Sequence, residues 1–172
     1  MKKLIFGLVA IGILIVIVVL KANVVFIASS GKVVNSKGED LSNVQVMYNY
    51  RCSSGETLYW QTENVTQTTD SNGQFQIPSY KSFKLSNIGA ECSKQVIAYK
   101  ENYSHYKNNC EQAINRIGNS QIANLDIRNA CSDNVYVKPS AKTVLMRLDL
   151  INDAPNYDPS KPNTFDVDGL LR

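Results

Sequence analysis

The chain has two parts that differ in their pattern of hydrophobic and polar residues. Behind Met1, Lys2 and Lys3 comes an unbroken run of 17 apolar or glycine residues, LIFGLVAIGILIVIVVL, at 4–20. As an α-helix this run would be about 25 Å long, which is within the usual range for a segment that crosses a bilayer. From residue 24 onward, short apolar runs alternate with polar residues and are separated by turn residues, a pattern that is typical of β-strands.

The first two runs predict a β-hairpin. Residues 24–34, VVFIASSGKVV, are rich in β-branched side chains, and residues 43–50, NVQVMYNY, alternate apolar and polar positions. The sequence Asn-Ser-Lys-Gly at 35–38 lies between them and is a turn signal. We therefore expect the two runs to be neighbouring antiparallel strands.

A second hairpin is predicted around the stretch TTDSNGQF. The Thr-rich run 56–69 precedes it and the alternating run 74–77, QFQI, follows it, before Pro78 ends the pattern. The turn residues are Asp70, Asn72 and Gly73. An Asn-Gly pair supplies the positive φ angles that tight hairpin turns require. An EF-hand calcium loop is the alternative for this turn, but Lys81 stands where that loop needs a bidentate Glu.

The second half of the chain predicts short strands within 83–88 and 94–103, and a last strand at 142–150. Residues 108–118 predict one short helix, because four residues share a helical stripe that ends before Gly118: Cys110, Ala113, Ile114 and Ile117. The helix belongs to an insertion at 104–139. Short strands with frequent turns and one embedded helix favour a mainly β chain, folded as an antiparallel β-sandwich.

Three regions follow from this pattern. Residues 1–22 form an N-terminal membrane anchor or signal, and 23–150 form the β-sandwich domain with its insertion. Residues 151–172 contain three prolines and no periodicity, which predicts an extended tail. In that tail Tyr157, Phe165 and Leu170-Leu171 could contact a partner or lie along the domain.

The apolar run could be an uncleaved transmembrane helix or a cleaved signal peptide. A signal peptide has a shorter apolar core followed by a small-x-small site, and the candidate sites 20–22 and 28–30 fit poorly. We therefore favour a single-pass anchor. Lys2 and Lys3 hold the N-terminus in the cytoplasm, which places the domain outside the cytoplasm, in the periplasm of a bacterial cell. With cleavage, the domain would be secreted.

The cysteines agree with an exported domain. Four are present, all after the apolar run and none in a C-x-x-C pair: Cys52, Cys92, Cys110 and Cys131. In an oxidising compartment they predict two disulfides, with three possible connectivities. The sandwich plan favours Cys52 with Cys92, at one end of two antiparallel strands, and Cys110 with Cys131 inside the insertion. A zinc site is the alternative, but its ligands generally come in close pairs.

Charge and composition exclude several classes of partner. Three of the 18 Lys and Arg residues precede residue 22, which leaves 15 bases against 15 acids in the domain and tail. A balanced domain lacks the clustered basic face that binds a phosphate backbone, so no nucleic-acid partner is expected. No cofactor and no metal ligand set is expected either.

Two fragments resemble the carboxypeptidase regulatory-like domain. The first, 31–46, matches the pattern of that family at seven positions: Gly31, Val33, Gly38, Leu41, Asn43, Val44 and Val46. The second is TDSNGQF at 69–75. A late strand of the family ends in Gly-Tyr, and Asn102 stands in place of that glycine here. The resemblance implies a prealbumin-like, Ig-like β-sandwich over 25–103 and 142–150. It implies no peptidase activity, because the zinc catalytic domain that this module accompanies has no counterpart here.

Candidate chemistry in the sequence is sparse. His105 is the only histidine and lies in a polar stretch, so we expect a solvated loop residue rather than a general base. Four aromatic residues could form a recognition face on neighbouring strands, although core packing would also explain them: Tyr48, Tyr50, Tyr59 and Trp60.

The sequence therefore favours a non-enzymatic, membrane-tethered domain that binds or scaffolds another component of the cell envelope. An inhibitory or immunity-type protein against a secreted toxin is the alternative, with the insertion as its contact surface. A transthyretin-like hydrolase is a third hypothesis, weakened because such enzymes use several histidines.

Overall fold

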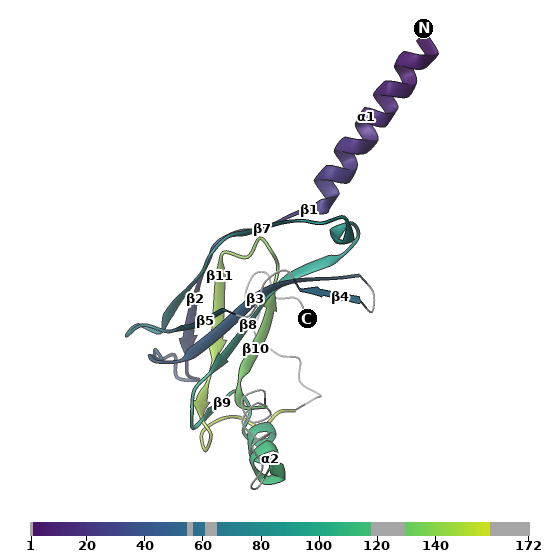
Figure 1. Ribbon diagram of the computed structural model, residues 1–172. Coiled ribbons are helices and arrows are strands. Elements are labelled where there is room, and N and C mark those ends of the chain that lie inside the picture. Colours follow the sequence, from purple (N-terminus) through teal and green to yellow (C-terminus); the bar gives the residue numbers. More distant parts are fainter. Residues whose placement is uncertain (1, 55–56, 61–64, 118–129, 159–172) are drawn as a thin grey trace.

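The computed structural model of the chain describes residues 2–54, 57–60, 65–117 and 130–158 (Figure 1). The N-terminal helix α1, Lys2–Ala22, extends away from the rest of the chain. No helix within the described ranges is long and apolar enough to cross a membrane. The expected membrane segment 4–20 includes side chains, at positions 4, 5 and 8, that lie outside the described residues. Strand β1, Asn23–Phe26, follows α1 directly.

The chain is mainly β, as expected, and its larger sheet is antiparallel. The strand order is β10-β8-β3-β4, and β5 also pairs with β3. The long strands β3 and β8 are paired over nine residues, from Gln45 opposite Tyr99 to Ser53 opposite Glu91. The bounds of the five strands are β3 Gln45–Ser54, β4 Thr57–Trp60, β5 Val65–Thr68, β8 Glu91–Tyr99 and β10 Asp133–Val137.

A second sheet has the order β11-β2-β6, with β2 at Ser29–Val34, β6 at Gln74–Ile77 and β11 at Thr143–Arg147. Two short ribbons complete the described strands. One pairs β1 with β7, Tyr80–Phe83, and the other pairs β9, Tyr103–Ser104, with β12, Asp149–Leu150. Two helical elements described after α1 are the 3₁₀ turn η1, Leu85–Asn87, and α2, Lys107–Ile117.

One hydrophobic core holds side chains from both larger sheets. In β3, β6 and β11 every second residue enters this core, which is the two-residue period of a half-buried strand. Its members include Val46, Tyr48, Val96 and Ala98 from the five-stranded sheet, and Val33, Phe75, Ile77, Val144 and Met146 from the three-stranded sheet.

Both predicted hairpins are wrong in their pairing. The strands on either side of residues 35–38 belong to different sheets, because β2 pairs with β6 and β11 whereas β3 pairs with β8, β5 and β4. Likewise β5 pairs with β3, and β6 pairs with β2. Each turn therefore carries the chain from one sheet to the other across the core. One pair also departs from the expected antiparallel order, since β11 lies parallel to β2.

The Asp70–Gly73 turn has the geometry that its residues favour, but not that of a tight hairpin. The Asp70 carboxylate accepts hydrogen bonds from the backbone N–H groups of Asn72, at 2.9 Å, and Gln74, at 2.8 Å. Gly73 N–H donates to Asp70 O at 3.1 Å, and Gly73 is the one residue of this turn with a positive φ, +68°. A single positive φ fits a type I turn that ends in glycine, whereas the tight hairpin turn needs two.

The two expected disulfides are present, Cys52–Cys92 and Cys110–Cys131. Cys52 and Cys92 lie directly opposite each other on β3 and β8. Cys110 lies on α2, whose bounds agree with the predicted helix. Residues 133–137, within the predicted insertion, form β10 and pair with β8 of the larger sheet. The predicted strand at 83–88 is also wrong, since β7 ends at Phe83 and η1 follows.

The described part of the tail, 151–158, packs against the start of α2. Pro155 O accepts a hydrogen bond from Lys107 N–H at 2.9 Å, and the Asn108 side chain bonds both the N–H and the C=O of Tyr157. Ala154 is buried. Residues 159–172, with Phe165 and Leu170-Leu171, lie outside the described residues.

Candidate functional site

The expected aromatic face is not formed by Tyr48 and Tyr50. Both side chains point into the shared core and are 7% and 3% exposed. Tyr50 stacks on Tyr80, with ring centroids 4.9 Å apart and planes 6° apart, and its hydroxyl donates to Pro78 O. Burial raises the pKa of Tyr50 to about 12. The side chains of Tyr59 and Trp60 lie outside the described residues. A role of these two residues in an aromatic recognition face stays a prediction.

The opposite face of the larger sheet is polar. Asn49 on β3 lies opposite Gln95 on β8, which lies opposite Tyr136 on β10. Gln95 accepts a hydrogen bond from Asn49 Nδ2 at 3.4 Å and donates one to the Tyr136 hydroxyl at 2.9 Å. The Arg51 guanidinium lies 4.3 Å from the centroid of the Tyr136 ring. These side-chain contacts link the three strands. Because Asn49 and Gln95 are buried, only the rim of the row is accessible.

His105 is not the solvated loop residue that the sequence suggested. Its side chain is 11% exposed, and Nδ1 lies 3.0 Å from Arg147 O and 3.6 Å from Asp133 Oδ1. Asp133 Oδ2 in turn accepts a hydrogen bond from Arg147 N–H at 2.8 Å. Burial raises the pKa of Asp133, while the neighbouring His105 opposes that shift.

These contacts give the His105–Asp133 pair a structural role at the edge of β11. Leu148 N–H donates to Val34 O, on the β2 side of the strand, whereas the N–H and C=O of Arg147 face the other way, toward Asp133 and His105. An unpaired strand edge exposes such backbone groups. The pair therefore caps the N–H and the C=O of one residue, Arg147, at the free edge of β11. The Arg147 side chain binds Asp149, with Nε 3.2 Å from Oδ2. Both groups of the pair thus have structural partners.

Lys94 is a buried residue that sequence reasoning missed. Its ammonium group donates hydrogen bonds to Ile27 O at 2.6 Å, to Ala141 O at 3.0 Å and to the Ser29 hydroxyl. Three donors meet three acceptors, so the group joins β8 to the approach to β2 and to the loop before β11. Burial lowers the pKa of Lys94 to about 8. The signal in the sequence was its position, because Lys94 precedes Val96 and Ala98 on the same face of the strand.

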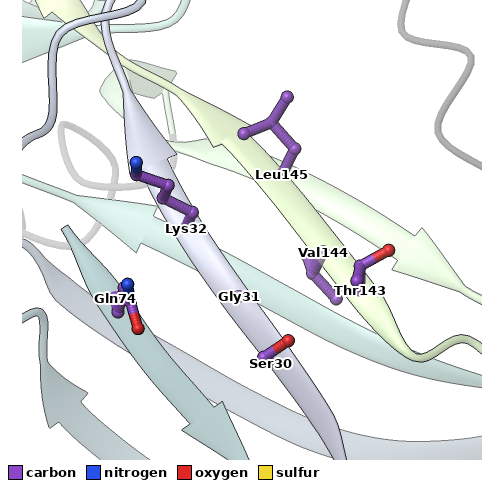
Figure 2. Close-up of a pocket in the computed structure, with 7 residues that line it drawn as sticks. All are labelled: Ser30, Gly31, Lys32, Gln74, Thr143, Val144 and Leu145. Atoms are coloured by element: carbon purple, nitrogen blue, oxygen red, sulfur yellow. The ribbon is translucent and has the colours of Figure 1, made fainter. Parts of the chain in front are cut away.

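An open groove of about 320 Å³ lies on the outer face of the three-stranded sheet (Figure 2). It crosses all three strands. The side chains of Lys32 and Leu145 rise from β2 and β11, and both are accessible: the Lys32 side chain is 42% exposed, and Leu145 as a residue is 37% exposed. Lys32 Nζ lies 2.7 Å from Asp40 Oδ1. The other lining residues are Ser30, Gly31, Gln74, Thr143 and Val144. This groove is an accessible candidate for ligand contact, and no sequence motif indicated it.

Neither the groove nor the polar clusters form a metal centre. Across the described residues, no group of three or more His, Cys, Asp or Glu side chains could hold a metal ion. The groove instead combines a lysine, hydroxyl and amide groups with one leucine, a mixture that suits a polypeptide or another polar ligand with apolar parts.

Comparison with known proteins gives no family. No family model matches the chain, and no curated protein matches it. Among solved structures, the chain has a likeness to 3-chlorocatechol 1,2-dioxygenase from Rhodococcus opacus 1CP, with 15% sequence identity and a TM-score of 0.36. The match covers 73% of this chain and 59% of the dioxygenase chain. A likeness this distant supports no statement about fold or activity.

Proposed function

We propose that this chain is a non-enzymatic binding domain, tethered to a membrane and held on the extracytoplasmic side of the cell envelope. The observation that carries the proposal is helix α1. It has 21 residues, most of its described apolar side chains are exposed, and it leads directly into a domain with two disulfides. A large exposed apolar surface needs a lipid or protein environment, and disulfides persist in oxidising compartments.

The tether in this proposal is the apolar run 4–20, with Lys2 and Lys3 on the cytoplasmic side. For a bacterial cell the domain is then periplasmic. Removal of α1 by a signal peptidase would convert the same domain into a secreted protein, so the length of the mature chain distinguishes the two.

We further propose a prealbumin-like sandwich of the carboxypeptidase regulatory type. In its support, the two fragments that carry the resemblance contact each other. Val33 N–H, in the first fragment, donates to Gly73 O, in the second, at 2.9 Å. Within the first fragment, Leu41 N–H donates to Val33 O at 3.0 Å. A Cβ at Gly73 would approach Val33 O to 2.6 Å, so the close contact requires glycine. Asn102, which replaces the glycine of the family, has a φ of +65°.

The surface that would bind the partner is the groove on the three-stranded sheet. Ser30, Gln74, Thr143 and Leu145 are exposed there, whereas the polar row on the larger sheet is mostly buried. Because Lys32 is already paired with Asp40, a ligand would meet a neutral polar surface with Leu145 as its apolar contact.

Three experiments test the proposal. Alkaline carbonate should leave the full chain in the membrane fraction, and the unreduced chain should show no free thiol. A photo-crosslinking residue at Thr143, in the groove, should capture a resident envelope protein, and one at Ile114, exposed on α2, should not. Capture of a secreted hydrolase through Ile114 alone would instead favour the inhibitor hypothesis. Release by carbonate together with free thiols would contradict the tethered, exported domain.

A further inference from the structure

The end of α1 is fixed to the surface of the domain by η1 and its flanks. Ala22 O accepts hydrogen bonds from Lys84 N–H at 3.2 Å and from Asn87 Nδ2 at 3.1 Å. Ala22 and Asn87 are both buried in this junction. Residues 83–88 therefore lie beside the point where α1 meets the domain (Figure 1).

Exposed apolar side chains gather at this junction. Nine large hydrophobic residues outside α1 are exposed among the described residues, and four of them belong to β1, β7 and η1 with its flank: Val25 at 43%, Phe83 at 59%, Leu85 at 66% and Ile88 at 38%. The pairing of β1 with β7 puts Val25 opposite Lys81 and Asn23 opposite Phe83, so these residues share the outer face of one ribbon. Single exposed apolar residues are ordinary, whereas a group of them marks an interaction site.

Basic residues surround the apolar group. Lys21 is the last basic residue of α1, and Lys81 and Lys84 flank Phe83; all three are exposed. The described segments 21–27 and 78–90, which form this junction, contain no Asp or Glu. Apolar side chains bordered by lysines are the composition of surfaces that enter the interface of an anionic bilayer.

We propose that this surface, made of Val25, Lys81, Phe83, Lys84, Leu85 and Ile88, is a second membrane contact that inserts into the interface of the bilayer that holds α1. The inference rests on the proposed tether. It commits to anionic phospholipid as the partner, because the lysines complement the headgroups and the apolar side chains fit the region about 5 to 10 Å below them. Its continuity with the end of α1 keeps it at the membrane surface.

The test uses the full chain in nanodiscs that contain phosphatidylglycerol. In a Trp60→Phe background, Leu85→Trp is the reporter, and Leu150→Trp is the matched control. Leu150 is also exposed, at 47%, but lies in β12, which pairs with β9 at the end of the domain far from α1 (Figure 1). Lipids with brominated acyl chains should quench the fluorescence of Leu85→Trp at least about twofold more than that of Leu150→Trp, because only the former would reach the acyl region. Equal quenching of the two variants would overturn the inference.

A second measurement needs no tryptophan variant. Amide hydrogen exchange of residues 83–88 in the unmodified chain should be slower in nanodiscs with phosphatidylglycerol than in nanodiscs of phosphatidylcholine alone, and Lys81→Gln/Lys84→Gln should remove the difference. Exchange that ignores the lipid charge would count against the anionic partner. Failure of the tether is separate: it would show as release of the protein by alkaline carbonate, and that result would remove both proposals.

Discussion

The aromatic ring of Phe75 fills the space beside the α-carbon of Gly31 on the neighbouring strand. The two residues are opposite each other in the pairing of β6 with β2, and a Cβ built on Gly31 would overlap the ring carbons. Phe75 is 3% exposed and belongs to the shared core. Glycine at position 31 is thus required by the packing of one large side chain.

We expect Gly31→Ala to lower the free energy of unfolding by about 1 to 3 kcal/mol, because the added methyl group overpacks the core. Urea denaturation would measure it. In a Phe75→Leu background the cost of Gly31→Ala should fall, since a smaller side chain leaves room for the methyl group. Ser30→Ala, at the adjacent exposed position, is the control. An equal cost of Gly31→Ala in both backgrounds would contradict the contact.

The Asp70 carboxylate should stabilise the turn between the two sheets. Asp70→Ala removes the acceptor of two backbone hydrogen bonds, and we expect a loss of about 1 to 2 kcal/mol. Asp70→Asn keeps a side-chain oxygen and should lose less than half of that. Thermal unfolding at matched protein concentration measures both, and equal losses would show that charge rather than hydrogen bonding matters.

The cap on the edge of β11 gives a third prediction. Asp133→Ala would leave Arg147 N–H without its acceptor, and we expect a loss of about 1 to 3 kcal/mol with faster exchange of that amide. Asp133→Asn retains an oxygen and should protect the Arg147 amide better than alanine does. Exchange of the Val144 amide, on a core residue of the same strand, is the internal control. Unchanged exchange at Arg147 in both variants would rule out the cap.

Lys94 makes stability depend on pH. Its pKa in the folded chain is about 8, below the ordinary value of 10.5, so between these values the unfolded chain binds more protons. Stability should therefore rise as the pH increases from about 8 to about 10. Above about pH 10 Tyr50 opposes this rise in stability. Its pKa is about 12 in the folded chain and 10.0 ordinarily, so the tyrosine hydroxyl loses its proton in the unfolded chain first. Urea titrations at several pH values should show the rise in the native chain and a smaller one in Lys94→Met.

The two disulfides should differ in what they stabilise. The Cys52–Cys92 bond closes a loop with a sequence separation of 40 and the Cys110–Cys131 bond one of 21, which correspond to about 4 and about 3 kcal/mol in the chain-entropy model. Replacing both cysteines of the first pair by serine should lower the melting temperature of the whole domain. The second replacement should mainly increase hydrogen exchange in α2. Equal exchange in α2 with and without the second bond would contradict this division.

The turns could be predicted from sequence because their causes are local. Gly38, Gly73 and Asn102 all adopt the positive φ that their residue types favour, +81°, +68° and +65°. The preferred disulfide pairs are also confirmed: the strand order favoured Cys52 with Cys92, and the insertion favoured Cys110 with Cys131. The pairing of strands did not follow, because a turn fixes where the chain reverses but not which sheet the next strand joins.

The polar clusters depend on contacts far apart in the sequence. His105 meets the backbone of a residue 42 positions away, and Lys94 meets Ile27 across 67 positions. A histidine in a polar stretch predicts a solvated residue, and the sequence does not show that the free edge of β11 lies beside His105. The tyrosines of β3 were misassigned for a simpler reason: their alternation was correct, but the face they share is the core.

The direct passage from Ala22 into Asn23 makes the helix and the domain one mechanical unit. With no intervening loop to absorb rotation, turning α1 about its axis turns the groove and the β1–β7 ribbon by the same angle. One extra helical residue at this junction would swing the domain by about 100°. Any contact that fixes the rotation of α1 about its axis thus also determines the direction in which the groove faces.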